Sequence, residues 1–218
     1  LGVIAIGTGN DIARSIGLPV LDEEKSIAAI IEGFEKPKSI DLVEAKTAEG
    51  RFWFAGTASA GFDALVNARA NRWSWPKGPI KYQLAMLFEL TKFRAINYRV
   101  ELNEEIREFS AMLCAVANAP AFGGGMLIVP SADLLDGKLE LFIVHKISRL
   151  ELIKIFPKVY SGQHIDHPAV EIIRADSVKI ESGNMPVYSD GEAVGHSPLE
   201  ARVHPAKLRV VGAHAFVA

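Results

Sequence analysis

The sequence predicts an α/β piece followed by a β-rich, sandwich-like domain with a few covering helices. Two patterns support this prediction. Residues 3–6 are apolar and mostly β-branched, as in a buried parallel strand, and a glycine-rich turn joins them to a helix-like segment. From residue 97 onwards, short apolar runs alternate with turn residues, as in an antiparallel sheet. We place the boundary at residue 38, which divides the chain into residues 1–38 and 39–218.

The glycine-rich turn covers residues 7–10, Gly-Thr-Gly-Asn. Gly7 and Gly9 permit a tight connection between strand and helix, and Asn10 is a favoured helix N-cap. The N–H groups at a helix N-terminus attract anions such as phosphate. Two familiar phosphate patterns are excluded, because Ile12 stands where GxGxxG needs glycine and GxxxxGK[ST] does not occur. The turn is therefore either a phosphate cradle or a plain connection.

A helix is predicted over residues 22–34, with Asp22 as its N-cap. Its apolar residues fall on one face, which we expect to pack on the core: Ile27, Ile30, Ile31 and Phe34. Residues 39–46 and 51–58 alternate towards strands and meet across a turn at residues 48–50, which predicts a hairpin.

Residues 72–93 form the candidate membrane-facing segment. Trp73 and Trp75 lie in a loop, and residues 80–93 form a broadly apolar helix flanked by lysine and arginine. Apolar area with peripheral cations is how interfacial helices bind a bilayer. A helix that covers a β-sheet has the same pattern and is the commoner case. The two tryptophans are therefore the better candidates for membrane contact.

The second half of the chain is predicted to be mostly β. The expected strands are residues 98–102, 106–117, 139–144, 170–180, 187–189 and 199–203. Ser148 is expected to cap a helix over residues 149–159. Asp190-Gly191 reads as the tip of a hairpin. The His-Ile-Asp-His stretch at residues 164–167 reads as a solvated turn.

The composition argues against nucleic acid as a partner, because a net charge of -2 and a pI near 6.3 give no general basic field. The single cysteine, Cys114, lies in an apolar run, so we expect a buried thiol in a reducing cytoplasm. No apolar run approaches the roughly 20 residues that span a bilayer, and the N-terminus lacks signal-peptide features. Because the chain starts at Leu1 on the threshold of a strand, we expect a fragment.

Residues 7–14, GTGNDIAR, resemble the GTGNDxAR segment of the diacylglycerol kinase catalytic family, which includes soluble bacterial lipid kinases, sphingosine kinases and ceramide kinases. Two further family motifs follow in order, GGG…DG over residues 123–137 and DGE at residues 190–192. The resemblance covers nearly all of the chain. It implies that residues 1–38 end a nucleotide-binding lobe whose GGDGT phosphate loop is missing from this sequence.

The resemblance implies an ATP-dependent lipid kinase that uses Mg²⁺ and transfers the γ-phosphoryl group to a diacylglycerol-like lipid at a membrane surface. Glu192 would be the base that takes the proton from the lipid hydroxyl, with Asp190 as its electrostatic or magnesium-linked neighbour. Asp11 and Asp41 would orient hydrated Mg²⁺. The cofactor-binding residues implied by the glycine-rich turn are Gly7, Thr8, Gly9 and Asn10.

The resemblance also implies a structural divalent-cation site at Asp133, Asp136 and the main-chain oxygen of Lys138. From the residues alone, Asp133 and Asp136 are hard-oxygen ligands that suit Mg²⁺ or Ca²⁺, and Asp136-Gly137 is also a hairpin turn. Both interpretations can hold together.

Two other functions compete with the lipid kinase. One is an NAD-kinase-like small-molecule kinase, and the other is a non-catalytic lipid-binding fragment. Because GGDGT is missing, we expect this piece alone to be inactive. The sequence leaves a homodimer open.

Overall fold

The computed structural model describes residues 1–7, 9–76, 94–103 and 105–213, together with residues 81, 84–85 and 88–89. Its helices are α1 (Asp11–Ser15), α2 (Glu23–Gly33), α3 (Phe62–Arg72) and α5 (Arg149–Ile155), with short 3-10 turns at Phe156–Tyr160 and Gln163–Asp166. Its strands are β1 (Lys38–Lys46), β2 (Arg51–Phe54), β3 (Thr57–Ser59), β4 (Ile96–Leu102), β5 (Glu105–Ala117), β6 (Leu139–His145), β7 (Val170–Ala175), β8 (Ser177–Glu181), β9 (Pro186–Ser189), β10 (Glu192–His196) and β11 (Leu199–Val210).

The strands form one 11-stranded antiparallel sheet in the order β10-β9-β3-β5-β4-β8-β11-β1-β2, with β6 and β7 attached through β5. Strand β5 joins the parts of the sheet, because its first half pairs with β4 and its second half pairs with β6 and β3. The sheet curls until the tip of the β1–β2 hairpin contacts β10, at the opposite end of the strand order. The predicted β-rich, sandwich-like domain is thus confirmed as a nearly closed antiparallel sheet.

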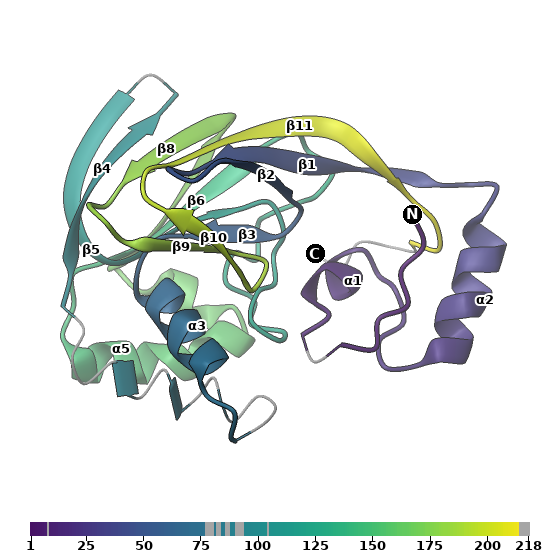
Figure 1. Ribbon diagram of the computed structural model, residues 1–218, viewed down its shortest axis with the longest axis horizontal. Helices are drawn as coiled ribbons and strands as arrows, with labels where there is room; N and C mark the ends of the chain where they lie inside the picture. The colour runs from purple at the N-terminus through teal and green to yellow at the C-terminus, as the bar shows by residue number, and fades with distance from the viewer. Residues whose placement is uncertain are drawn as a thin grey trace.

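Among the described residues, three hydrophobic clusters hold this arrangement. The first lies inside the curled sheet, where inward residues of alternating strands such as Val43, Val100 and Ile180 are fully buried. The second lies between β5–β6 and helices α3 and α5, which cover the sheet from below in Figure 1. The third packs α1 on the ends of β1 and β11 through Ile16 and Ile40. This third cluster places α1 beside the sheet.

The N-terminal piece differs from the predicted parallel strand. Residues 3–6 form no strand, and Ala5 alone makes an isolated parallel bridge, to Val20. Ile4 and Ile6 are exposed, because a single bridge leaves the alternate side chains uncovered. Asn10 stands at the N-cap of α1 in a left-handed conformation, φ 59°, and its side chain caps no N–H group.

Helix α2 is confirmed, and its N-cap Asp22 accepts a hydrogen bond from the Lys25 N–H at 3.0 Å. The predicted buried face is wrong. Most of its apolar side chains are exposed, whereas the small residues Ser26 and Ala29 are buried. Helix α2 approaches the chain after β11 so closely that a Cβ at Gly33 would collide with the backbone of Gly212. Small side chains therefore form this contact.

Two predicted strands are each split in two. The run over residues 51–58 breaks after β2, and β3 pairs with β5 and β9 instead of continuing the hairpin with β1. The run over residues 170–180 breaks at Asp176, so that β7 pairs with β6 and β8 pairs with β4 and β11. The β1–β2 hairpin and the β9–β10 hairpin at Asp190-Gly191 are confirmed.

The cap at Ser148 is also confirmed. Helix α5 ends at Ile155, earlier than predicted, and a 3-10 turn follows it. Residues 164–167 are not a solvated turn throughout, because His164 is 1% exposed and its Nε2 lies 2.7 Å from the Ile128 carbonyl oxygen.

Cys114 is buried, as expected. Among the described residues, no helix combines the length and apolar character that crossing a membrane requires. Most of the predicted helix over residues 80–93 lies outside the described residues.

Candidate functional site

The tip of the β9–β10 hairpin is fixed by the Asp190 carboxylate. It accepts hydrogen bonds from three consecutive N–H groups, those of Ala55 (3.2 Å) and Gly56 (3.2 Å) between β2 and β3 and that of Thr57 (2.9 Å) at the start of β3. The Asp190 N–H also donates to the Thr57 carbonyl at 3.0 Å. Charged hydrogen bonds are the strong ones, so this carboxylate pins the hairpin tip to the break between β2 and β3.

Asp190 as a whole is exposed at the turn, but its carboxylate points towards the protein and contacts backbone N–H groups. Burial raises the pKa of this carboxyl, the three N–H groups oppose the rise, and the negative charge of Asp11 adds to it. A Cβ at Gly56 would collide with Asp190 Oδ1 and lie 2.8 Å from Ile12 Cδ1, so the Asp190 carboxylate lies near the start of α1, which Asp11 begins. Carboxylate oxygens are the ligands that Mg²⁺ prefers.

Asp11 is the first residue of α1, and its carboxylate binds the triple-glycine loop. Its two oxygens accept hydrogen bonds from the N–H groups of Gly124 (2.8 Å) and Gly125 (2.6 Å). Both glycines have positive φ, 90° and 95°, which other residues rarely adopt. A Cβ at either position would meet open space, so backbone conformation rather than crowding favours glycine there.

The glycine-rich turn before α1 is held by side chains that follow it. Asn10 Nδ2 donates to the Gly7 carbonyl at 2.6 Å, and Arg14 Nη1 donates to the Gly9 carbonyl at 2.5 Å. Thr8 lies outside the described residues. Gly7, Gly9, Asn10 and Asp11 thus lie along one short segment that meets the triple-glycine loop through the Asp11 carboxylate.

Glu192 begins β10, two residues after Asp190, and is exposed. In the part of the chain that the structure describes, its carboxylate has no ion-pair partner. An exposed carboxylate without a partner retains all its acceptor positions. It is therefore available to a ligand beside the hairpin tip.

Asp41 is 2% exposed, and its carboxylate binds backbone N–H groups of two segments that are distant in the sequence. Its oxygens accept hydrogen bonds from the N–H groups of Gly137 and Ala206, both at 2.7 Å. Asp41 lies at the irregularity in the β1–β11 register, where Ala206 has a positive φ of 52°. Asn118 Nδ2 links this region to the β2–β3 connection by donating to the carbonyls of Asp41 (3.3 Å) and Ala55 (2.8 Å). The hydrogen-bond partners of Asp41 therefore differ from those of Asp11 and Asp190.

The predicted cation loop is a compact turn. Asp133 accepts the Leu135 N–H at 3.0 Å, and Asp136 accepts the Lys138 N–H at 2.9 Å and pairs with Arg174. Lys138 Nζ pairs with Asp176 Oδ1 at 2.5 Å. No three His, Cys, Asp or Glu side chains of the described residues group in a way that could hold a metal ion. The cation role of Asp133, Asp136 and Lys138 stays a prediction.

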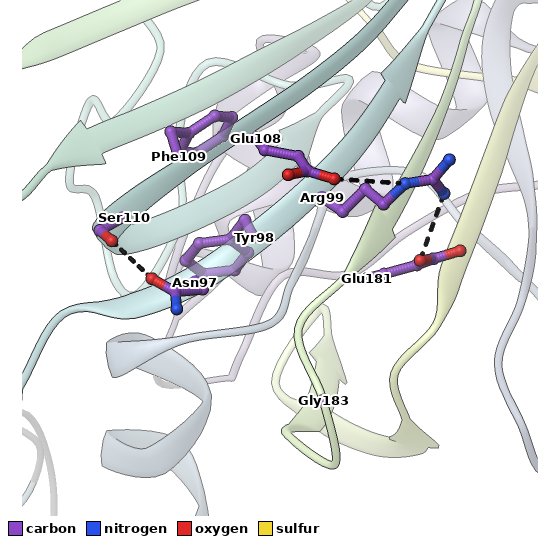
Figure 2. Close-up of a pocket in the computed structure, with 8 residues that line it drawn as sticks. All are labelled: Asn97, Tyr98, Arg99, Glu108, Phe109, Ser110, Glu181 and Gly183. Atoms are coloured by element: carbon purple, nitrogen blue, oxygen red, sulfur yellow. Dashed lines mark hydrogen bonds and ion pairs between the residues drawn. The ribbon is translucent and has the colours of Figure 1, made fainter.

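A cavity of about 500 Å³ lies away from these residues, on β4, β5 and the end of β8 (Figure 2). Its polar wall is a ladder of cross-strand pairs in which Arg99 contacts Glu108 at 3.7 Å and Glu181 at 3.4 Å. Ser110 Oγ donates to Asn97 Oδ1 at 2.5 Å. None of the predicted site residues lines it.

A second cavity, of about 360 Å³, lies between α3 and the β9–β10 hairpin. Its apolar walls include Leu65 and Pro186, and its polar residues include Arg69, Arg72 and His196. Sequence reasoning missed these polar residues. The three-residue spacing of the two arginines on a helix was the available signal, because such residues share a face. The cavity adjoins the strand that Glu192 begins.

Residues 56–212 match the family described as the YegS C-terminal NAD kinase beta sandwich-like domain. The matched residues include strands β3 to β11, so most of the curled sheet belongs to a domain of this class. The chain is 38% identical over 214 residues to a diacylglycerol kinase of Mycobacterium tuberculosis, a match that covers 97% of this chain and 68% of the relative. The chain belongs to the diacylglycerol kinase catalytic-domain family.

The chain is also similar to a second relative and to a solved structure. A Bacillus subtilis diacylglycerol kinase is 28% identical over 202 residues, covering 92% of this chain and 65% of the relative. A crystal structure of a diacylglycerol kinase from Bacillus anthracis str. Sterne superposes with a TM-score of 0.66 at 17% identity, covering 97% of this chain and 66% of that one. This structural likeness shows the fold alone. The chain spans about two thirds of the length of these relatives.

Proposed function

We propose that the whole protein is an ATP-dependent lipid kinase, and that this chain carries the acceptor side of its active site. The reaction would transfer the γ-phosphoryl group of ATP to the hydroxyl of a diacylglycerol-like lipid. The observation that supports the proposal most directly is that the hairpin with Asp190 and the exposed Glu192 meets α1, which Asp11 begins, in a chain of the diacylglycerol kinase family.

Positioning and charge neutralisation provide most of the catalysis in phosphoryl transfer. Asp11 and Asp190 would hold Mg²⁺ through the acceptor positions that their backbone hydrogen bonds leave unused. When bound, Mg²⁺ supplies positive charge to the phosphate oxygens. Gly7, Thr8, Gly9 and Asn10 would line the ATP phosphates. The predicted role of Asp41, orienting hydrated Mg²⁺, stays a prediction. Each of its two oxygens already accepts a backbone hydrogen bond.

Glu192 would accept the proton of the lipid hydroxyl as that oxygen attacks the γ-phosphorus. A carboxylate can do this when it lies within hydrogen-bond range of the hydroxyl in the complex. The cavity between α3 and the β9–β10 hairpin would receive the part of the lipid next to the hydroxyl. It combines apolar walls with Arg72 and the Arg69–Glu89 ion pair, and it adjoins the strand that Glu192 begins.

The lipid would reach this cavity from a membrane surface. Trp75 is 80% exposed in the loop after α3, and Leu84 and Phe88 are about 44% and 43% exposed near it in sequence. Tryptophan and exposed apolar residues with nearby cations are typical of interfacial contact. These features support peripheral membrane association of a cytoplasmic protein.

The test uses the full-length protein, labelled ATP, Mg²⁺ and a total lipid extract. Wild type is expected to label a chloroform-soluble product, and Glu192→Gln is expected to lose about 10²–10⁴-fold of the rate, the usual contribution of a general base. Glu108→Gln is the matched control, because Glu108 is an exposed glutamate on the cavity remote from the hairpin.

Other outcomes identify the alternatives. Label in added NAD instead of lipid would support a small-molecule kinase, which the NAD kinase-like description of the matching domain favours. Lipid binding without label transfer by wild type would support a non-catalytic lipid-binding protein. Full activity of Glu192→Gln would remove Glu192 from the role of base.

A further inference from the structure

We infer that Glu49 is a positioning residue for Glu192, because it latches β10 to the tip of the β1–β2 hairpin. The catalytic part of this inference rests on the proposed function. The latch joins residues 147 positions apart in the sequence.

Two atoms of His196 bind the Glu49 carboxylate. The His196 N–H donates to Glu49 Oε2 at 2.7 Å, and the ring Nδ1 lies 2.5 Å from Oε1. These hydrogen bonds, that from the imidazole foremost, hold the pKa of the Glu49 carboxyl below its usual value. Two-point binding fixes the direction of the strand end as well as its distance from the hairpin tip.

The hairpin tip makes two further bonds to the same strand. Thr47 Oγ1 donates to the Val194 carbonyl at 2.8 Å, and the Ala48 N–H donates to the His196 carbonyl at 3.3 Å. Thr47 is 3% exposed, so its hydroxyl is enclosed at this contact. The latch is therefore a set of bonds between two surfaces that touch, rather than a lone surface ion pair.

The hairpin tip and β10 approach each other closely at Gly195. A Cβ at this position would collide with the Glu49 carboxylate and with Thr47 Oγ1. Gly195 also has a φ of 126° and follows the irregularity in the β9–β10 pairing. The irregularity turns the end of β10 away from a regular ladder with β9, and the hairpin tip binds the strand at that point.

Strand β10 ends the strand order of the sheet and contains five residues. The Asp190 carboxylate fixes the turn before it, and Glu49 fixes its last residue. His196 lies four residues from Glu192, about 13 Å along a strand. A short strand held at both ends keeps Glu192 in one place. It also keeps His196 at the wall of the cavity proposed for the acceptor.

The experiment compares Glu49→Ala, Glu49→Gln and Glu44→Gln in the full-length protein. Glu44 is the matched control, since it lies on the same hairpin and also pairs with a histidine, His204 at 3.2 Å, but contacts no residue of β10 in the described part. Amide hydrogen exchange measures whether the bonds between Glu49 and His196 persist, and label transfer from ATP to a total lipid extract measures catalysis.

In Glu49→Ala the His196 amide is expected to lose protection while amides of β5 and β6 keep theirs, which shows that the fold persists. The kcat is expected to fall about 10- to 100-fold, as for a misplaced catalytic group, with the KM for ATP unchanged. Glu49→Gln retains one acceptor oxygen and should recover part of the rate. Glu44→Gln should match wild type in both measurements.

Unchanged protection of His196 in Glu49→Ala would overturn the latch. Lost protection with an unchanged kcat would overturn the positioning role while leaving the latch in place. If wild type transfers no label, the proposed function fails and the catalytic role of Glu49 fails with it, but the exchange data still decide whether Glu49 holds β10.

Discussion

The Asp190 carboxylate occupies the space that a side chain at residue 56 would need. A Cβ built on Gly56 collides with Asp190 Oδ1 and would lie 2.8 Å from Ile12 Cδ1 of α1. The absence of a side chain at residue 56 thus lets the hairpin tip, the β2–β3 connection and α1 meet. This contact joins the segments that carry Asp11 and Asp190.

Gly56→Ala is therefore expected to destabilise the protein by about 1–3 kcal/mol, the usual cost of forcing extra volume into a packed site. Urea denaturation measures this loss. In the double variant Gly56→Ala with Asp190→Ala, the clash with the carboxylate is gone, so the two losses should sum to more than the measured total. Strict additivity would show that the two residues do not crowd each other.

Asp41→Asn is expected to lower the free energy of unfolding by about 1.5–3 kcal/mol, because an amide nitrogen would face the N–H group of Gly137 or Ala206 where an oxygen now accepts. Denaturation in the presence of EDTA separates this loss from any metal effect. Asp133→Asn, an exposed position, serves as the control. A stability of Asp41→Asn equal to wild type in EDTA would indicate that Asp41 serves a ligand rather than the fold.

The buried His164 predicts a pH-dependent stability. Burial lowers its pKa from the ordinary 6.5, against the opposing backbone carbonyls of Ile128 and Lys158. The unfolded chain therefore binds a proton near pH 6.5 that the folded chain does not, and stability falls as pH drops through that value. In His164→Gln this contribution to the slope between about pH 7.5 and 5.5 should disappear. Identical slopes for variant and wild type would contradict the assignment.

Trp75→Ala is expected to weaken binding to anionic lipid vesicles, measured by sedimentation, by about 10- to 100-fold, since burying one large apolar side chain is worth about 1.5–3 kcal/mol. Trp53→Ala is the control. Trp53 is also exposed, at 46%, but lies on β2 with Lys207 above its ring. Equal binding of the two variants would show that the loop after α3 does not contact the membrane.

Local patterns predicted much of the fold. Asp190-Gly191 predicted a hairpin because turn chemistry is decided by adjacent residues, and Asp22 and Ser148 predicted helix starts for the same reason. The strands were found through their apolar runs. Their breaks were not, because the split after β2 depends on the carboxylate of Asp190, more than 130 positions away in the sequence.

The site itself was predicted through motif resemblance more than through geometry. The roles of Asp11, Asp190 and Glu192 stay predictions, and nothing local indicates that Asp41 binds Gly137 and Ala206. His164 looked solvated because its burial is created by packing on residue 128 and Phe142. Such contacts depend on segments that become neighbours only after the sheet curls.

The curl of the sheet also affects how this protein meets other chains. An edge strand usually presents a row of unpaired backbone groups on which a foreign strand can assemble. At β10 the Val194 carbonyl, the His196 N–H and the His196 carbonyl are already taken by Thr47, Glu49 and Ala48. The hairpin tip therefore shields this edge from strand addition, and loosening it would expose a site for aggregation.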